Sequence, residues 1–100
     1  MNIIHDTMAH RFQVEVDGFI GYVDYQLVEG DLDVRHTIVP KEIGGRGIAG
    51  ALVKAAYDYA LQEHLRCVAT CSYAVKWLEK HPEYNGEKGC DFAGEGSCAL

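Results

Sequence analysis

Alternating apolar and polar residues over the first forty positions predict three consecutive strands. Phe12, Val14 and Val16 alternate with polar neighbours, which is the pattern of a half-buried strand. The same alternation continues over about 19–27 and 32–39. Turns that contain glycine, Asp17-Gly18 and the segment 29–31, separate these runs. The order indicates an antiparallel meander.

Helical spacing replaces the alternation after this meander. Apolar residues recur every four positions from Ile48 to Ala60, which predicts an amphipathic helix that ends near His64. A short buried strand over 66–71 and a helix over 73–80, with Ser72 as its N-cap, follow. We therefore expect one domain over residues 1–84, an α/β or α+β sheet covered by helices. Residues 85–100 are rich in glycine and acidic residues, and we expect a flexible tail there.

Composition excludes several classes of protein. The net charge of -6 argues against nucleic-acid binding, which requires clustered lysine and arginine. No apolar run resembles a signal peptide or a membrane span, so we expect a cytoplasmic protein that contacts no membrane. In a reducing cytosol the four cysteines are expected as free thiols. Cys67 and Cys71 have no second pair at zinc-site spacing, so no metal site is predicted.

The glycines in "EIGGRGIAG", just before the long helix, indicate that a ligand approaches the backbone closely. A P-loop is excluded, because Ala51 and Leu52 stand where lysine and a hydroxyl residue are required. Gly45, Gly47 and Gly50 have dinucleotide-fingerprint spacing, but the next strand ends without the acidic residue that would hold a ribose. A third possibility is a pyrophosphate bound by the N–H groups of the first helical turn. The alternative is that the glycines bind no ligand and only form a tight connection between strand and helix.

The loop "GGRGIA" resembles the pyrophosphate-binding motif of the GNAT acetyltransferases, Gln/Arg-x-x-Gly-x-Gly/Ala. Gly47 and Ala49 fit it, whereas Gly44 replaces the usual Gln or Arg. Together with "ATCSYAVKWLEKHPEY", the segment "HTIVPKEIGGRGIAGALVKAA" is similar to the very small GNAT proteins of the YjdJ type, also called the N-acetyltransferase YJ domain. The match covers about 12–84.

This resemblance implies a single-domain GNAT fold, with a mixed, mostly antiparallel sheet and helices packed on its faces. It implies an N-acetyltransferase that moves acetyl from acetyl-CoA to a primary amine, leaving CoA. Backbone N–H groups near the end of the third strand would bind the pantetheine, and the loop would bind the pyrophosphate. The implied cofactor-binding residues are Ile38, Val39, Gly44, Gly45, Arg46, Gly47, Ile48 and Ala49.

The catalytic candidates are Cys71 and His36. Cys71 matches the family's "CSY" cysteine, and a helix N-terminus would lower the pKa of its thiol; packing of a small buried residue is the alternative. His36 shares a strand phase with Leu32 and Val34, which predicts a core histidine, whereas the resemblance suggests a general base. Tyr73 and Tyr84 are both candidates to protonate the leaving thiolate. Glu42 is a further candidate base, and Trp77 is expected to pack the last helix onto the sheet.

Two other functions stay open from the sequence. A CoA-binding module with little catalysis, acting as a sensor or interaction partner, would suit a chain too short for a large acceptor-binding region. A small dinucleotide-binding protein would explain the glycine spacing. The acceptor amine, a small molecule or a protein, is not specified, and either a monomer or a homodimer is compatible.

Overall fold

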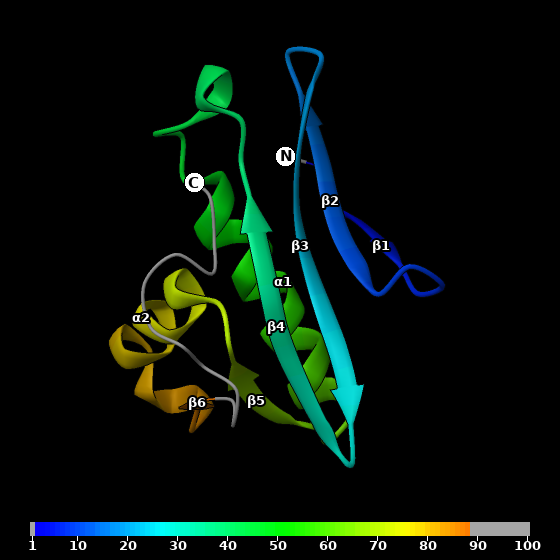
Figure 1. Cartoon of the computed structure of the whole chain (residues 1–100), viewed down its shortest axis with the longest axis vertical. Helices are drawn as coiled ribbons and strands as arrows, with labels where there is room; N and C mark the ends of the chain where they lie inside the picture. The colour runs from blue at the N-terminus through cyan, green and yellow to red at the C-terminus, as the bar shows by residue number, and fades with distance from the viewer. Residues whose placement is uncertain (1, 89–100) are drawn as a thin grey trace.

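The computed structural model describes residues 2–88, and this part of the chain forms a mixed sheet with helices packed against it (Figure 1). The elements in chain order are β1 (Ile4–Asp6), β2 (Arg11–Val16), β3 (Phe19–Val28), β4 (Asp31–Ile38), the short 3₁₀ helix η1 (Lys41–Ile43), α1 (Ile48–Gln62), β5 (Arg66–Ala69), α2 (Ser72–Lys80), the 3₁₀ helix η2 (Pro82–Tyr84) and β6 (Glu87–Lys88).

The six strands lie in the sheet in the same order as in the chain, β1-β2-β3-β4-β5-β6. The first four are antiparallel neighbours, as the turns at Gly18 and Gly30 require. The pairs β4–β5 and β5–β6 are parallel. Parallel neighbours need a crossover, and α1 provides it between β4 and β5. The predicted meander, helix, strand and helix are therefore confirmed.

Helix α1 forms most of the core against one face of the sheet. It contacts β2, β3, β4 and β5, and Figure 1 shows it running behind β4. Its apolar positions at helical spacing are buried, as the sequence pattern predicts. They pack on the side chains that alternate inward from the strands. The buried residues of α1 are Ile48, Leu52, Val53, Ala56, Tyr57 and Ala60.

A bulge in β4 changes which side chains face α1. Asp24 pairs with His36 but Tyr25 pairs with Val34, so Arg35 is the extra residue on β4. Side chains beyond the bulge therefore switch faces, because alternation has a period of two. Thr37 is buried and His36 is exposed. The prediction that His36 shares a face with the apolar residues of this strand is wrong for this reason.

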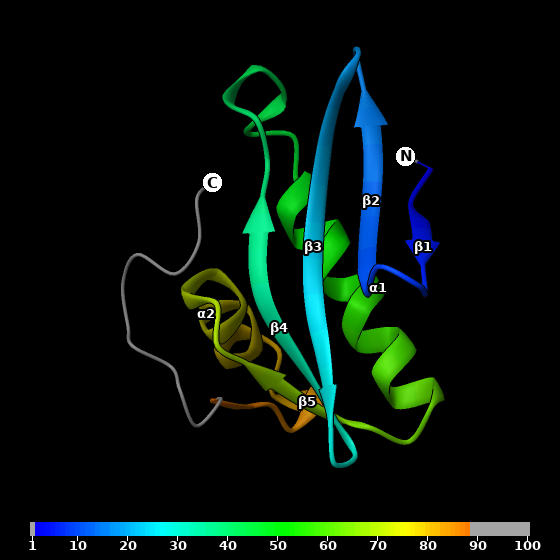
Figure 2. The ribbon, with the colours of Figure 1, turned by 45° about the vertical axis from the view of Figure 1, so that its right-hand side comes forward.

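The strands β4 and β5 separate at their carboxyl ends. Their pairing runs only from Asp31 opposite Arg66 to Val34 opposite Ala69. The backbone N–H groups of Thr70 and Cys71 then both donate to the Val34 carbonyl oxygen, each at 3.0 Å. Figure 2 shows β4 continuing upward while the chain after β5 turns into α2. The bulge and this separation occur at the same level of the sheet.

Helix α2 packs against β4, β5 and β6, and a cluster of aromatic rings joins it to α1. The Trp77 ring lies 5.8 Å from that of Tyr57 and 5.1 Å from that of Tyr84 in η2. His81 stacks on Trp77 at 3.9 Å. Trp77 is buried within the core, and its aromatic contacts are with α1, η2 and the residue that follows α2. That it packs α2 onto the sheet stays a prediction. The relative position of the two helices depends on this cluster.

Replacing Tyr57 by phenylalanine should lower the free energy of unfolding by roughly 1–3 kcal/mol. The Tyr57 hydroxyl is buried and donates a 2.8 Å hydrogen bond to the Val68 carbonyl oxygen, which joins α1 to β5. The variant keeps the ring but removes the donor. Urea unfolding measures the loss, and an unchanged free energy would show that the bond contributes nothing net.

The structure adds two edge strands that the sequence pattern did not predict. The edge strand β1 is held by His5, whose ring stacks on Phe12 at 4.0 Å and whose Nε2 lies 2.6 Å from the Tyr25 hydroxyl. The strand β6 lies within the range where we expected a flexible tail, so regular structure continues to Lys88. Residues 89–100 of that expected tail lie outside the described residues. No helix in the described range is long and apolar enough to cross a membrane.

Candidate cofactor-binding site

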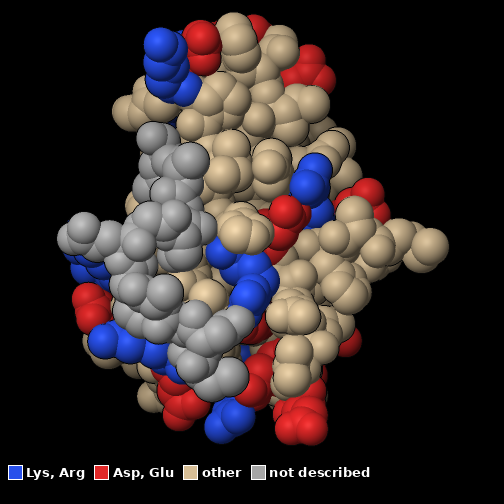
Figure 3. All heavy atoms as spheres, viewed as in Figure 1, with Lys and Arg blue, Asp and Glu red and all other residues tan. Residues whose placement is uncertain are grey.

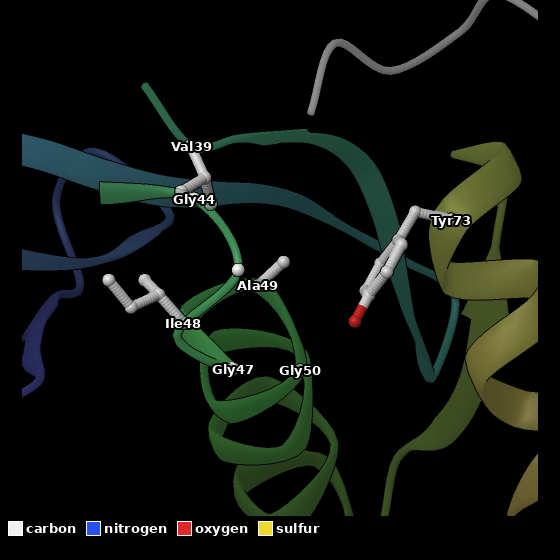
Figure 4. A pocket seen from close by; sticks show the side chains of 8 residues that line it. Val39, Gly44, Gly47, Ile48, Ala49, Gly50 and Tyr73 are labelled. Atoms are coloured by element: carbon white, nitrogen blue, oxygen red, sulfur yellow. The ribbon is translucent and has the colours of Figure 1, made fainter. Parts of the chain in front are cut away.

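A pocket of about 270 Å³ lies at the start of α1, between the end of β4 and the start of α2. It opens where β4 and β5 have separated, and Figure 4 shows its lining. Backbone of the glycine loop forms one side, and the Tyr73 ring from α2 forms the other (Figure 4). The lining residues are Val39, Gly44, Gly45, Gly47, Ile48, Ala49, Gly50 and Tyr73.

Two loop glycines have backbone conformations that other residues rarely adopt. Gly45 has φ of 76° and Gly47 has φ of 77°, both in the left-handed region. A Cβ at either position would meet no atom within 4 Å, so open space lies beside them. Gly47 is the N-cap of α1. The glycines thus turn the chain into the helix and leave the loop backbone accessible.

The backbone N–H groups in the first turn of α1 have no carbonyl oxygen of a preceding helical turn to which they could donate a hydrogen bond. The first bond of the helix joins the Ala51 N–H to the Gly47 carbonyl at 3.0 Å. The N-cap makes no side-chain hydrogen bond, and the first turn of this helix carries no acidic residue. The positive end of the helix dipole therefore faces the pocket without a protein carboxylate. Such a place attracts an anion such as a phosphate.

Arg46 and Ile38 are the two predicted cofactor residues that do not line this pocket. The Arg46 guanidinium instead forms a 2.6 Å ion pair with Asp17 in the β2–β3 turn, with both groups largely exposed. Ile38 pairs with Tyr22 on β3, and the next residue, Val39, is the one whose side chain is buried. The other six predicted residues all line it. That they bind a ligand stays a prediction.

The two candidate tyrosines have different surroundings. The Tyr73 ring points from α2 toward the first turn of α1 (Figure 4), and burial raises the pKa of its hydroxyl. The Tyr84 hydroxyl donates a 2.6 Å hydrogen bond to Asp58 on α1. Burial and then this bond raise the pKa of Tyr84 to about 12. Of the two, only Tyr73 lies at the pocket.

Cys71 lies at the N-cap of α2, where the prediction had placed Ser72. It is fully buried, with its sulfur 3.5 Å from the Thr37 hydroxyl oxygen. Cys71 is disulfide-bonded in this structure, while Cys67 is a free buried thiol. The expectation of free thiols is thus confirmed for Cys67 and wrong for Cys71. A nucleophilic role would require the reduced form, and Cys71 does not line the pocket.

Buried polar groups mark the place where β4 and β5 separate. The Thr70 hydroxyl donates to the Asp33 carboxylate at 2.9 Å, and Arg35 reaches the same carboxylate at 3.2 Å. Asp33 and Thr70 are both buried. His36, on the same strand, is exposed and pairs in register with Asp24. The structure therefore separates His36 from the pocket-lining side of β4, where Val39 lies.

Sequence reasoning did not assign Gly50 to the site. The sequence did contain a signal for it, because Gly50 lies inside a helical pattern, where a glycine usually has a packing or functional reason. The bulge in β4, which was not predicted, also had a signal: Val39 is out of phase with Leu32 and Val34 in the sequence. A shift of phase within one strand indicates a bulge.

Within residues 2–88, neither a metal-ligand cluster nor, on the face drawn in Figure 3, a basic patch marks a further site. No group of three or more histidine, cysteine, aspartate or glutamate residues within 2–88 could hold a metal ion. On the face drawn in Figure 3, the visible acidic and basic side chains are interspersed and form no continuous basic patch.

Comparisons with known proteins agree with the fold. The sequence profile described as GCN5-related N-acetyl-transferase matches residues 11–87. The chain is 35% identical to Protein NATD1 of Bos taurus, over 82% of this chain and 75% of that protein. It is 33% identical to Protein NATD1 of Danio rerio, over 84% and 81%.

A solved structure has the same fold. The NMR solution structure of a GCN5-like protein from Staphylococcus aureus matches with a TM-score of 0.67 and 27% identity, covering 88% of this chain and 87% of that one. The chain belongs to the GCN5-related N-acetyltransferase family, as its resemblance to that family predicts.

Proposed function

We propose that this protein binds acetyl-CoA and transfers its acetyl group to a primary amine. The observation that carries the proposal is the pocket at the start of α1, with glycine backbone on one side and a tyrosine on the other. Family membership supports the reaction class. The acceptor is proposed as a small-molecule or protein amine, and its identity is left open.

The residues present fit a pyrophosphate-bearing ligand. Gly44, Gly45 and Gly47 leave backbone accessible, and the unpaired N–H groups of the first turn of α1 would hold phosphate oxygens. Val39, at the end of β4, would contact the pantetheine arm on its way toward the separated strands. When bound, acetyl-CoA supplies the activated thioester.

Tyr73 is the residue that we assign to the leaving group. In the transfer, the amine nitrogen would bond to the thioester carbonyl carbon and the carbon–sulfur bond would break. The amine would give up its proton to solvent, from which the Tyr73 phenolate regains the proton that it donates. The sulfur leaves with the electron pair and takes a proton from the Tyr73 hydroxyl. Burial raises the pKa of Tyr73, which keeps this hydroxyl protonated at neutral pH. Cys71 and His36 stay predictions as catalytic residues.

Thermal unfolding with added ligands tests the cofactor first. Acetyl-CoA or CoA at 100 times its dissociation constant should add about 2.7 kcal/mol and raise the midpoint by roughly 10–20 °C. NAD and ATP at equal concentration should give no shift. A shift with NAD alone would replace the acetyl-CoA proposal by dinucleotide binding.

Turnover of amines tests the reaction itself. With acetyl-CoA bound, release of free CoA thiol in the presence of a panel of primary amines should exceed the rate without amine. Binding of CoA without turnover on any small amine or lysine peptide would favour the alternative, a CoA-binding module with little catalysis.

A further inference from the structure

Gly50 lies in the second half of the first turn of α1, a place where glycine weakens a helix relative to alanine. Unlike Gly45 and Gly47, it does not need a left-handed backbone. The turn chemistry that explains its neighbours therefore does not explain Gly50. A glycine in a helix interior indicates that something packs closely against the backbone there.

Tyr73 is what packs against it. A Cβ built on Gly50 would lie 3.3 Å from the Tyr73 hydroxyl oxygen and 3.9 Å from Nε1 of Trp77. The first distance is shorter than an ordinary van der Waals contact, so an added methyl group would push the phenol away. Figure 4 shows the ring directed from α2 to this part of α1.

The helix that carries Tyr73 is itself packed against α1. Trp77, one helical turn along α2, contacts Tyr57 of α1 through its ring. Tyr73 itself is partly buried and packs against the core cluster. Its hydroxyl oxygen thus lies beside the bare backbone at Gly50, on a helix whose position relative to α1 the Trp77–Tyr57 contact helps to set.

We propose that Gly50 is a positioning residue, whose missing side chain sets where the Tyr73 hydroxyl lies over the first turn of α1. The proposal rests on the proposed function, in which that hydroxyl protonates the CoA thiolate. It assigns to Gly50 no contact with the reacting atoms. Any side chain at position 50 would move the proton donor away from the sulfur.

A double-mutant cycle with Gly50→Ala and Tyr73→Phe tests this. In the Tyr73→Phe background the hydroxyl is absent, so alanine should act as a better helix former and raise the unfolding midpoint by roughly 4–8 °C. In the wild-type background the same change should give no rise. An equal rise in both backgrounds would overturn the proposal. This arm needs no substrate.

Kinetics provide the second arm. Gly50→Ala should lower kcat by roughly 10-fold or more and leave the KM for acetyl-CoA within about 3-fold, because the loop backbone that holds phosphate is intact. In the Tyr73→Phe background it should cause no further loss of kcat. A further loss of the same size would overturn the positioning role. If no variant, including the wild type, acetylates any amine, the proposed function fails, while the unfolding cycle still decides the contact.

Discussion

Replacing Gly47 by valine should weaken CoA binding by about 100-fold or more, which corresponds to roughly 2.7 kcal/mol. Gly47 is the N-cap of α1 with φ of 77°, and it lines the pocket. A branched side chain there would occupy space next to the first helical N–H groups. Isothermal titration with CoA measures the change.

The same substitution also strains the backbone, so a matched control is needed. Gly30 has φ of 85°, and a Cβ there would meet no atom within 4 Å. It lies in the β3–β4 turn, outside the pocket. Gly30→Val should therefore cost similar stability, roughly 1–2 kcal/mol or more, and leave CoA affinity unchanged. Equal affinities of the folded Gly47 and Gly30 variants would remove the loop from the proposed site.

Replacing Tyr73 by phenylalanine should lower kcat by roughly 100-fold or more, with CoA affinity nearly unchanged. The variant keeps the ring in the pocket wall and removes only the hydroxyl group, which would give its proton to the leaving thiolate. Steady-state kinetics with an amine found in the panel measure kcat, and titration measures the affinity.

Tyr84→Phe is the matched control, because it removes a hydroxyl from the other candidate tyrosine. That hydroxyl binds Asp58 and lies away from the pocket. Its loss should lower the free energy of unfolding by about 1–2 kcal/mol and leave kcat unchanged. A fall in kcat with Tyr84→Phe and none with Tyr73→Phe would reverse the assignment of the proton donor.

Periodicity sufficed for most of the fold because most elements bury one face. The strands β2 and β3 and the helix α1 alternate or repeat cleanly, and their predicted bounds agree with the structure to within a few residues. The strand β1 was not predicted because it has only three residues, and its pairing with β2 and the ring contacts of His5 join it to residues later in the chain. Such contacts are tertiary and leave no period.

The site was predictable where glycine spacing marks it and not where tertiary contacts make it. The loop was predictable because the glycines that mark it can be read directly from the sequence. The place of His36 did not, because one extra residue in β4 reverses every later side chain. The ion pair of Arg46 with Asp17 joins segments that are far apart in the chain, so no local pattern indicated it.

The order of strands in the sheet has a consequence for how the domain assembles. Because β1 to β4 are neighbours in the chain as well as in the sheet, this part can form by successive short-range pairings. The parallel β4–β5 pair is different, since the whole of α1 must be spanned before the strands meet. The pocket is built from residues on both sides of that crossover. We therefore expect that the pocket cannot form before the β4–β5 pair does. A CoA-sized ligand would then stabilise the contacts across this parallel pair, which form late, more than the early pairings of β1 to β4.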